Sequence, residues 1–125
     1  MTSDEFRRML DSLADGWARR DYVAVIEHFA TDVFYCDPLR YTFQGKSELF
    51  AFFSDDCGMT QDCVFHRSIY DEERQAGVAE YTYTGNHIYH GTVWIEILDG
   101  KISCWREYQH ISNTKHSEFW KGSGK

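Results

Sequence analysis

The chain has 125 residues, of which 42% are hydrophobic and 17% are aromatic, as expected for one globular domain with its own core. Nine Phe, eight Tyr and four Trp residues exclude a disordered chain. Thirteen Lys and Arg residues against twenty Asp and Glu residues give a net charge of −7, which has the wrong sign for binding a phosphate backbone, so no nucleic-acid partner is expected.

Two helices are predicted near the N-terminus. In the first, Thr2 and Glu5 have the spacing of a capping box, and apolar residues follow with helical period at positions 6, 9, 10, 13 and 17. In the second, Asp21 is the expected N-cap residue. The apolar face of this second helix is predicted to consist of Tyr22, Val25, Ile26 and Phe29.

A short strand and a third helix are predicted next. Residues 33–37 alternate in the manner of a strand, and Pro38 either ends that strand or places it at the edge of a sheet. Gly45 introduces a helix over residues 46–53. The segment between them, residues 39–44, is expected to be a loop.

The second half of the chain is predicted to form strands over residues 63–70, 78–84, 88–98 and 101–111. The dipeptide Asp99-Gly100 between two alternating runs is a strong hairpin signal. Helices at the front and an antiparallel meander behind them predict an α+β domain. The domain is expected to cover residues 1–112, followed by a C-terminal tail over residues 113–125 that frays at Gly122–Lys125.

The sequence also gives expectations about cellular location, cofactors and metal ions. No apolar run approaches the ~18 residues of a membrane span, and the first residues are neither basic nor followed by an apolar signal region, so a cytoplasmic protein without a membrane partner is expected. Nucleotide-binding glycine loops and the Gly-x-Ser-x-Gly elbow are absent, so no cofactor is expected. The four cysteines match no common zinc spacing, and His87 and His90 lie across a hairpin tip, so no metal is expected.

A few short segments resemble a known family. They are Phe29-Ala30-Thr31-Asp32, Tyr35-Cys36-Asp37-Pro38, Gly45 before a helix, Asp99-Gly100-Lys101-Ile102 and Trp105-Arg106-Glu107-Tyr108. Over residues 3–112, these segments and the order of the elements resemble a SnoaL-like protein of the nuclear-transport-factor-2-like superfamily. The resemblance implies a cone, in which a strongly bent antiparallel sheet wraps around the N-terminal helices and encloses a hydrophobic pocket. It also implies a homodimer through the outer face of the sheet.

Limonene-epoxide hydrolase, from the same superfamily, is similar in two motifs. Its Tyr-x-Asn motif matches Tyr35-Cys36-Asp37, so Tyr35 takes the place of the water-binding tyrosine. Its Trp-Arg-Asp-Tyr motif matches residues 105–108, so Glu107 takes the place of a catalytic aspartate. Its Arg-x-Asp pair has no counterpart, because the strand over residues 78–84 offers only Glu80 as a charged residue.

Ketosteroid isomerase, also of this superfamily, is similar at Asp37-Pro38, which matches its general-base aspartate. Its two oxyanion donors fall near Leu13 and Val93 in this chain, so the hydrogen bonds that would stabilise an enolate are missing. Isomerisation of that kind is therefore not expected.

Strand alternation places Trp105, Glu107 and Gln109 on one face of the last strand. Aligned by the resemblance, Glu107 and Gln109 point inward beside Val93 and Ile95 of the preceding strand. A carboxylate against an apolar wall has a raised pKa, which suits general acid or base catalysis near neutrality. The alternative is that Glu107 lies at the mouth of the cone or pairs with an arginine such as Arg67.

Other residues are weaker candidates for the same pocket. Asp37 is a second candidate carboxylate, or it orders the loop that follows Pro38. Tyr35 is two residues before Asp37 and therefore lies on the same face of the strand, where its hydroxyl would orient a water or a substrate oxygen. The alternative is that Tyr35 is a core aromatic residue. Glu80 points inward or outward depending on the register of its hairpin, and His66 is either a pocket residue or a structural histidine.

The outer face of the sheet is predicted to carry Trp94, Arg106 and Tyr108, residue types that are enriched at protein–protein interfaces. The sequence thus leads to a small-molecule-binding protein, with Glu107, Asp37 and Tyr35 as catalytic candidates. The first hypothesis is a cofactor-free acid–base enzyme, of isomerase, cyclase or hydrolase type, that acts on a small apolar substrate. The second is a non-catalytic dimeric binding or accessory module, and the third is a trafficking adaptor that uses its outer surface.

Overall fold

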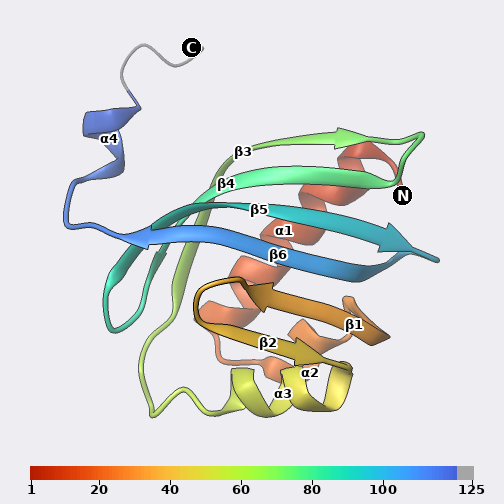
Figure 1. Ribbon diagram of the computed structural model, residues 1–125, viewed down its shortest axis with the longest axis horizontal. Helices are drawn as coiled ribbons and strands as arrows, with labels where there is room; N and C mark the ends of the chain where they lie inside the picture. Colours follow the sequence, from red (N-terminus) through yellow and green to blue (C-terminus); the bar gives the residue numbers. More distant parts are fainter. Residues whose placement is uncertain (121–125) are drawn as a thin grey trace.

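In the computed structural model, which describes residues 1–120, the strands form one curled sheet that does not close on itself (Figure 1). Across the sheet the order is β2-β1-β6-β5-β4-β3. The strands are β1 (Phe29–Asp37), β2 (Tyr41–Gln44), β3 (Asp62–Asp71), β4 (Ala76–Thr84), β5 (Ile88–Leu98) and β6 (Lys101–Ile111). Within residues 1–120, neighbouring strands run antiparallel except β1 and β6, which pair in parallel.

The long helix α1 (Ser3–Ala18) packs across the inner face of the sheet, behind β4–β6 in Figure 1. Its capping box is formed as predicted, because the Thr2 hydroxyl accepts from the Glu5 amide at 3.1 Å and the Glu5 carboxylate accepts from the Thr2 amide at 2.8 Å. The buried face of the helix consists of Phe6, Met9, Leu10, Leu13, Gly16 and Trp17. This apolar stripe is the reason the sheet curls around the helix rather than remaining open to water.

Two shorter helices follow α1. In α2 (Tyr22–Ile26), Asp21 caps the N-terminus as predicted, with its carboxylate accepting from the Ala24 amide at 3.2 Å. The helix ends earlier than predicted, because Phe29 is the first residue of β1 and is fully buried there. The third helix, α3 (Lys46–Ser54), begins after Gly45, whose φ of +92° suits a residue without a side chain.

Two elements were absent from the sequence prediction. Residues expected to be a loop contain β2, which pairs with the end of β1 so that Tyr35 lies opposite Phe43 and Asp37 opposite Tyr41. The short helix α4 (His116–Phe119) follows β6 within the predicted tail. Gly122–Lys125, where fraying was predicted, lies outside the described residues.

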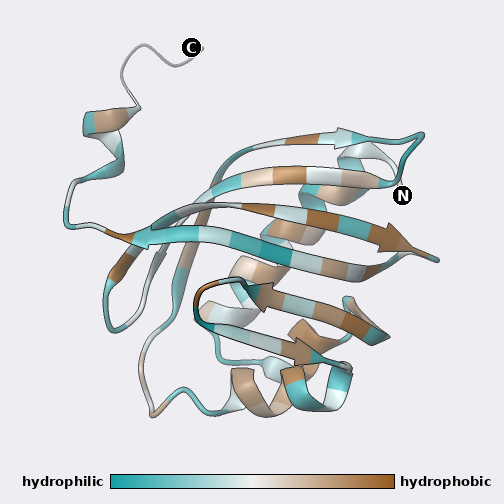
Figure 2. Ribbon diagram, in the orientation of Figure 1, coloured by the Kyte–Doolittle hydropathy of each residue, from teal (hydrophilic) through white to brown (hydrophobic). Residues whose placement is uncertain are grey.

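The hairpin between β5 and β6 sets the register of the inner face. Asp99 and Gly100 have φ values of +52° and +77°, as a two-residue hairpin turn of type I′ requires. Val93 consequently lies opposite Glu107, and Ile95 opposite Trp105. Figure 2 shows apolar and polar residues alternating along these strands, the pattern of a sheet with one buried face.

No helix within residues 1–120 has the length and apolarity that crossing a membrane would require.

Candidate functional site

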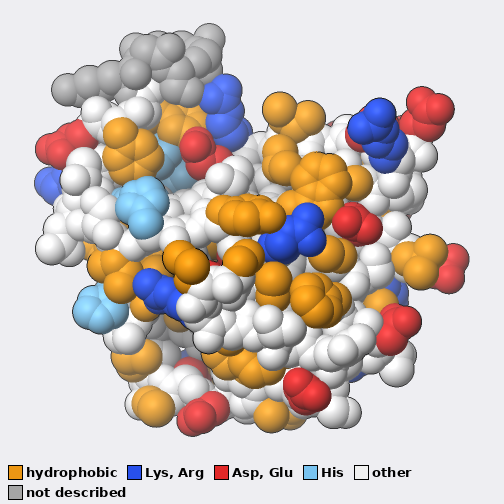
Figure 3. Space-filling view, in the orientation of Figure 1, with side chains coloured by type: hydrophobic (Ala, Val, Ile, Leu, Met, Phe, Trp, Pro, Cys, Tyr) orange, Lys and Arg blue, Asp and Glu red, His pale blue; other side chains and the backbone are white. Residues whose placement is uncertain are grey.

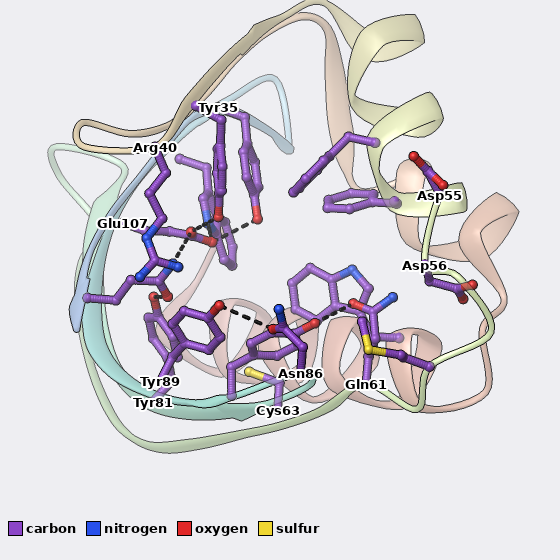
Figure 4. Close-up of a pocket in the computed structure, with 18 of the residues that line it drawn as sticks. Tyr35, Arg40, Asp55, Asp56, Gln61, Cys63, Tyr81, Asn86, Tyr89 and Glu107 are labelled. Atoms are coloured by element: carbon purple, nitrogen blue, oxygen red, sulfur yellow. Dashed lines mark hydrogen bonds between the residues drawn. The ribbon is translucent and has the colours of Figure 1, made fainter. Parts of the chain in front are cut away.

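A cavity of about 270 Å³ lies between the inner face of the sheet, α3 and the segment that leads from α3 to β3 (Figure 4). Its wall is mainly aromatic, comprising Trp17, Tyr35, Tyr41, Phe52, Phe53, Phe65, Tyr81, Tyr83, Tyr89 and Trp105. The polar lining residues are Arg40, Asp55, Asp56, Gln61, Asn86, Glu107 and Gln109. A mostly apolar wall with a few converging polar groups is typical of a small-molecule site.

Glu107 is the central polar group of this cavity and is only 7% exposed. Its Oε1 accepts from the Tyr35 hydroxyl at 2.8 Å and from the Trp105 indole at 2.9 Å. Its Oε2 accepts from the Tyr41 hydroxyl at 2.7 Å and from the Gln109 amide at 3.3 Å. All four donors are neutral, so within residues 1–120 no cationic side chain bonds to the carboxylate, and Arg67 is not among its donors.

Burial raises the pKa of the Glu107 carboxyl above its usual value. The hydrogen bonds from Tyr41, Trp105 and Tyr35 act in the opposite direction, because they stabilise the ionised form. The nearby charge of Asp37 raises the pKa further. This balance favours a proton on Glu107 at a higher pH than on an exposed glutamate.

The surroundings of Glu107 are positioned by three neighbouring strands. In the parallel pairing of β1 with β6, Tyr35 lies opposite Trp105, and their rings stack in parallel with centroids 5.7 Å apart. Tyr41, at the start of β2, stacks on Tyr35 from the other side at 6.3 Å. Since side chains alternate along a strand, Trp105 and Glu107 point to the same face, where both tyrosine hydroxyls reach the carboxylate.

Asp37 lies beside this site but is not part of the cavity wall. It is 3% exposed, and its Oδ1 accepts from the Leu39 amide at 3.0 Å, the loop-ordering contact foreseen as the alternative. Its Oδ2 accepts from the Gln109 amide at 3.1 Å, so one amide group bridges Asp37 and Glu107. Both carboxylates are thus brought together, with Gln109 between them.

The register of β4 directs the side chain of Glu80 away from the cavity. In the strand register, Glu80 lies opposite Arg67 of β3 and Thr92 of β5. Its side chain lies on the outer face of the sheet, whereas that of Tyr81 points inward. The Tyr81 hydroxyl donates to Gln109 Oε1 at 2.5 Å, which fixes the orientation of the amide that bridges the two carboxylates. The substrate-binding interpretation of Glu80 is therefore corrected, and Tyr81 is the residue of this strand that reaches the site.

Three further candidates lie outside the cavity wall. Val93 and Ile95 are on the inner face, as predicted, but are fully buried in the core behind the cavity. His66 lies at a bulge in β3 and bonds to the hydroxyl of Thr82 on the outer face at 2.7 Å. Its ring stacks on His116 of α4 at 3.4 Å, so it is a structural histidine. Burial lowers its pKa to about 4, and His116 and His90 add to this effect.

Asp56 is a second carboxylate of the cavity wall, on the side of α3. Its two oxygens accept from the Arg20 guanidinium at 2.7 and 3.0 Å, and it also accepts from the Tyr22 hydroxyl and, at 2.8 Å, from the Gly58 amide. The hydrogen bonds from Tyr22, Arg20 and Gly58 lower the pKa of Asp56 to about 2. Asp56 is therefore an ionised anchor for the segment that follows α3.

Gln61 extends this polar group across the cavity. Its amide donates to the Tyr22 hydroxyl at 2.7 Å, and its carbonyl accepts from the Tyr83 hydroxyl at 3.1 Å. The wall on this side is therefore closed by hydrogen bonds between α2, the segment before β3, and β4.

Arg40 is the cationic residue of the cavity wall within residues 1–120. Its guanidinium carbon lies 4.7 Å from the centre of the Tyr89 ring, and its Nε is 3.8 Å from Asp37 Oδ2. Figure 4 shows Arg40 and Tyr89 on the same side of the cavity, across from Asp55 and Asp56.

Sequence reasoning missed Tyr41, Tyr81, Asp56 and Arg40. Tyr41 was hidden because β2 is short and lacks a recognisable hairpin turn, and Asp56 because its segment has no periodic pattern. The alternation within residues 78–84 was a usable signal for Tyr81, once the hairpin register was known.

Within residues 1–120, no group of three or more His, Cys, Asp or Glu side chains has an arrangement that could hold a metal ion.

Comparisons with known proteins agree on the family and the fold. The family model for the SnoaL-like domain matches residues 6–105. Among solved structures, an NTF-2-like protein of unknown function from Burkholderia xenovorans LB400 has a TM-score of 0.76 at 16% identity, covering 98% of this chain and 95% of its own. No curated protein matches the chain.

Two solved structures that carry the name of an enzyme are also similar to this chain. An LEH-like epoxide hydrolase from M. tuberculosis has a TM-score of 0.73 at 18% identity, covering 86% of this chain and 84% of its own. A candidate ketosteroid isomerase from Kribbella flavida DSM 17836 has a TM-score of 0.74 at 17% identity, covering 90% and 82%. At such identities the likeness shows the cone-shaped fold and leaves the chemistry to the residues of the site.

Proposed function

Because the chain belongs to the SnoaL-like domain family, we propose that it binds a small molecule in the cavity and that Glu107 exchanges a proton with that molecule. The observation that carries this proposal is a buried carboxylate on the wall of an aromatic cavity, held by four neutral donors. Such a group is found where an enzyme needs an acid or base that works near neutral pH. The reaction class is cofactor-free acid–base catalysis.

The hydrogen bonds around Glu107 suggest how a proton would reach it. An ionised carboxylate has about four acceptor positions, and here each is occupied by a protein donor. The contact with the Gln109 amide, at 3.3 Å, is the longest of the four and the one most easily exchanged for a substrate or water. Tyr41 also lines the cavity, so its hydroxyl can pass a proton between the bound molecule and Glu107.

Asp37 and Tyr35 have supporting roles in this proposal. Asp37 is separated from the cavity by Gln109, so it acts through that amide and through its charge, as a positioning residue. Tyr35 is deeply buried between Tyr41 and Trp105, where its hydroxyl fixes Glu107 Oε1. Trp105 and Gln109 also line the cavity and contribute to binding.

The cavity limits the substrate to a small molecule. Its volume of about 270 Å³ lies near the lower end of the range for ligand pockets, roughly 300–1,000 Å³. The wall is mostly aromatic, so the bound part of the molecule is largely apolar.

The test is the substitution Glu107→Gln, assayed against small epoxides and enolisable ketones. The amide oxygen can accept from Tyr35 and Trp105, while its NH₂ group faces the Tyr41 hydroxyl, which can turn to accept. The variant is therefore expected to fold and bind, with turnover reduced about 10²-fold or more. Glu73→Gln, in the exposed turn between β3 and β4, is the matched control. Unchanged turnover by Glu107→Gln would exclude the acid–base role.

The second candidate function is binding without chemistry. It is favoured by the full hydrogen-bonding of Glu107, which leaves the carboxylate no free acceptor position in this structure. For a binding module, Glu107→Gln would change only the affinity for the ligand.

We also propose a homodimer through the outer face of the sheet. Figure 3 shows apolar side chains gathered over β3–β6, and Tyr108 is 54% exposed there, with its hydroxyl bonded to Arg106 at 2.7 Å. Trp94 lies opposite Arg106 on the neighbouring strand. Sedimentation of the wild type and of Tyr108→Glu tests this, since a dimer through this face predicts a monomeric variant.

A further inference from the structure

The cavity has an uneven balance of charge. Of the residues that line it, Glu107, Asp55 and Asp56 are acidic and Arg40 is basic. Asp56 is already paired with Arg20, and Arg40 is directed toward Asp37 at 3.8 Å. Glu107 is thus the buried carboxylate for which residues 1–120 supply no counter-charge. Buried charges in proteins are normally paired or removed by protonation, so the ionised form of Glu107 lacks a counter-charge that a ligand can supply.

Within residues 1–120, no cationic side chain bonds to Glu107. Asp37 lies at the end of β1 and Arg40 in the turn before β2, and Arg40 is directed toward Asp37. Arg106, the preceding residue of β6, lies on the opposite face of the strand, where its guanidinium donates to the Tyr108 hydroxyl. The titratable groups that face Glu107 are neutral at ordinary pH, namely Tyr35, Tyr41, Tyr81 and Cys63. Burial raises the pKa of each, so none of them contributes charge.

The wall around the unpaired carboxylate consists of aromatic rings. Cations are attracted to ring faces within about 6 Å, and a cage of aromatic side chains is a common solution for binding quaternary ammonium groups. The same cavity already contains one such contact, because the Arg40 guanidinium lies over the Tyr89 ring at 4.7 Å. Aromatic faces and a buried negative charge favour the same kind of ligand.

We propose that the ligand of this cavity is a small organic cation, an amine or quaternary ammonium compound with apolar substituents, whose charge is balanced by Glu107. The proposal rests on the proposed function for the location of the ligand and adds its chemical class. An anionic ligand would face the carboxylates of Glu107 and Asp55, while Arg40 is already directed toward Asp37. A neutral ligand would favour the protonated form of Glu107, whereas a cation favours the ionised form.

The test compares cations with neutral molecules of the same shape. Choline is compared with its carbon isostere dimethylbutanol, and benzyltrimethylammonium with neopentylbenzene. Binding is followed by the NMR signal of the Trp105 indole N–H, because this group donates to Glu107 and lines the cavity. At pH 8 at least one of the two cations is expected to bind about tenfold or more tightly than its isostere, since an opposite charge within ~4–6 Å of a carboxylate shifts its pKa by about one unit or more.

Glu107→Gln is expected to reduce the preference for the cation to within about twofold, whereas Glu73→Gln retains it. In the wild type, affinity for the cation increases with pH as Glu107 ionises, while affinity for the neutral isostere stays level. The pH series keeps the proposal testable if Glu107→Gln does not fold. Arg40→Gln removes the positive charge of the wall and is expected to increase cation affinity several-fold.

Three outcomes would overturn the proposal: equal affinity for cation and isostere, a preference that persists in Glu107→Gln, or no binding of either cation. Tight binding or turnover of a neutral compound would overturn the cationic class while leaving the proposed function intact. The proposed function would instead fail if Glu107→Gln retained full turnover, whatever the charge of the ligand.

Discussion

The two buried carboxylates of the cavity wall, Glu107 and Asp56, differ in the charge of the groups that donate to them. Asp56 accepts from a guanidinium, a tyrosine hydroxyl and a backbone amide, and these bonds lower its pKa to about 2. Glu107 accepts from neutral donors only, and burial raises its pKa. The difference separates an anchor that stays ionised from a group that can gain and lose a proton.

The two carboxylates also affect stability in opposite directions. The lowered pKa of Asp56 stabilises the fold above its unfolded pKa of about 4, and this contribution is lost as the pH falls toward about 2. The raised pKa of Glu107 means that the folded protein binds a proton more readily than the unfolded chain. Its contribution is therefore complete below an unfolded pKa of about 4.3 and declines as the pH rises through the folded pKa.

The largest expected effect comes from removing the Glu107 side chain. Glu107→Ala leaves the hydroxyls of Tyr35 and Tyr41 and the indole of Trp105 without an acceptor, and each unsatisfied donor costs about 1–3 kcal/mol unless water replaces the carboxylate. We expect a loss of about 3 kcal/mol or more in the free energy of unfolding, measured by urea denaturation. Glu107→Gln, which keeps the acceptor and the shape, should lie within about 1 kcal/mol of wild type. Equal losses in the two variants would contradict the donor arrangement.

Asp56→Asn is the corresponding change on the other side of the cavity. It removes the ion pair with Arg20 and weakens the hydrogen bond from Tyr22, so the segment leading to β3 loses its anchor. We expect a lower melting temperature by calorimetry. We also expect faster hydrogen exchange at the backbone amides of Gly58 and Gln61. Asp55→Asn, the exposed neighbour, is the control and should leave both properties unchanged.

The pH dependence of stability distinguishes the two groups. Between pH 4 and pH 8, the free energy of unfolding of the wild type should decline relative to Glu107→Gln, because ionisation of the buried carboxyl is penalised only in the wild type. As the pH falls from 4 to 2, the difference in the free energy of unfolding between the wild type and Asp56→Asn should decrease, because Asp56 becomes protonated. A wild-type advantage over Glu107→Gln that increases with pH would have the opposite sign and would contradict the account.

Removing single hydroxyl groups should give the smallest effects. Tyr41→Phe and Tyr35→Phe each delete one donor to Glu107, at a cost of about 1 kcal/mol in the free energy of unfolding. Both should raise the pKa of Glu107 further, since the ionised form loses a hydrogen bond. Tyr108→Phe, on the outer face, should not alter that pKa and is the control.

Much of the fold could be predicted from local patterns in the sequence. The capping box at Thr2, the Asp99-Gly100 turn and the alternation of Trp105, Glu107 and Gln109 each depend on residues close in the chain. The parallel pairing of β1 with β6 could not be predicted in this way, because it joins segments about 70 residues apart. That pairing brings Tyr35 to Trp105, and with β2 it completes the donors of Glu107.

The candidate site could be predicted only in part for the same reason. Glu107 was identified because strand parity and the family resemblance pointed to the same face. The face on which Glu80 lies depends on the hairpin register, and the face on which His66 lies depends on a bulge in β3. A shift of one residue moves a side chain to the opposite face of the sheet, and the sequence does not reveal such a shift. Asp56 and Arg20 are 36 residues apart and have no shared pattern, so their ion pair is visible only in the folded chain.

A titration of the labelled carboxyl carbons by NMR tests the central contrast most directly. We expect Glu107 to titrate above the usual value of about 4.3 for a glutamate, and Asp56 to titrate near 2. Addition of choline is expected to lower the pKa of Glu107 and to leave that of Asp56 unchanged. A Glu107 pKa at or below about 4.3 would contradict the claim that burial outweighs the hydrogen bonds to this carboxylate.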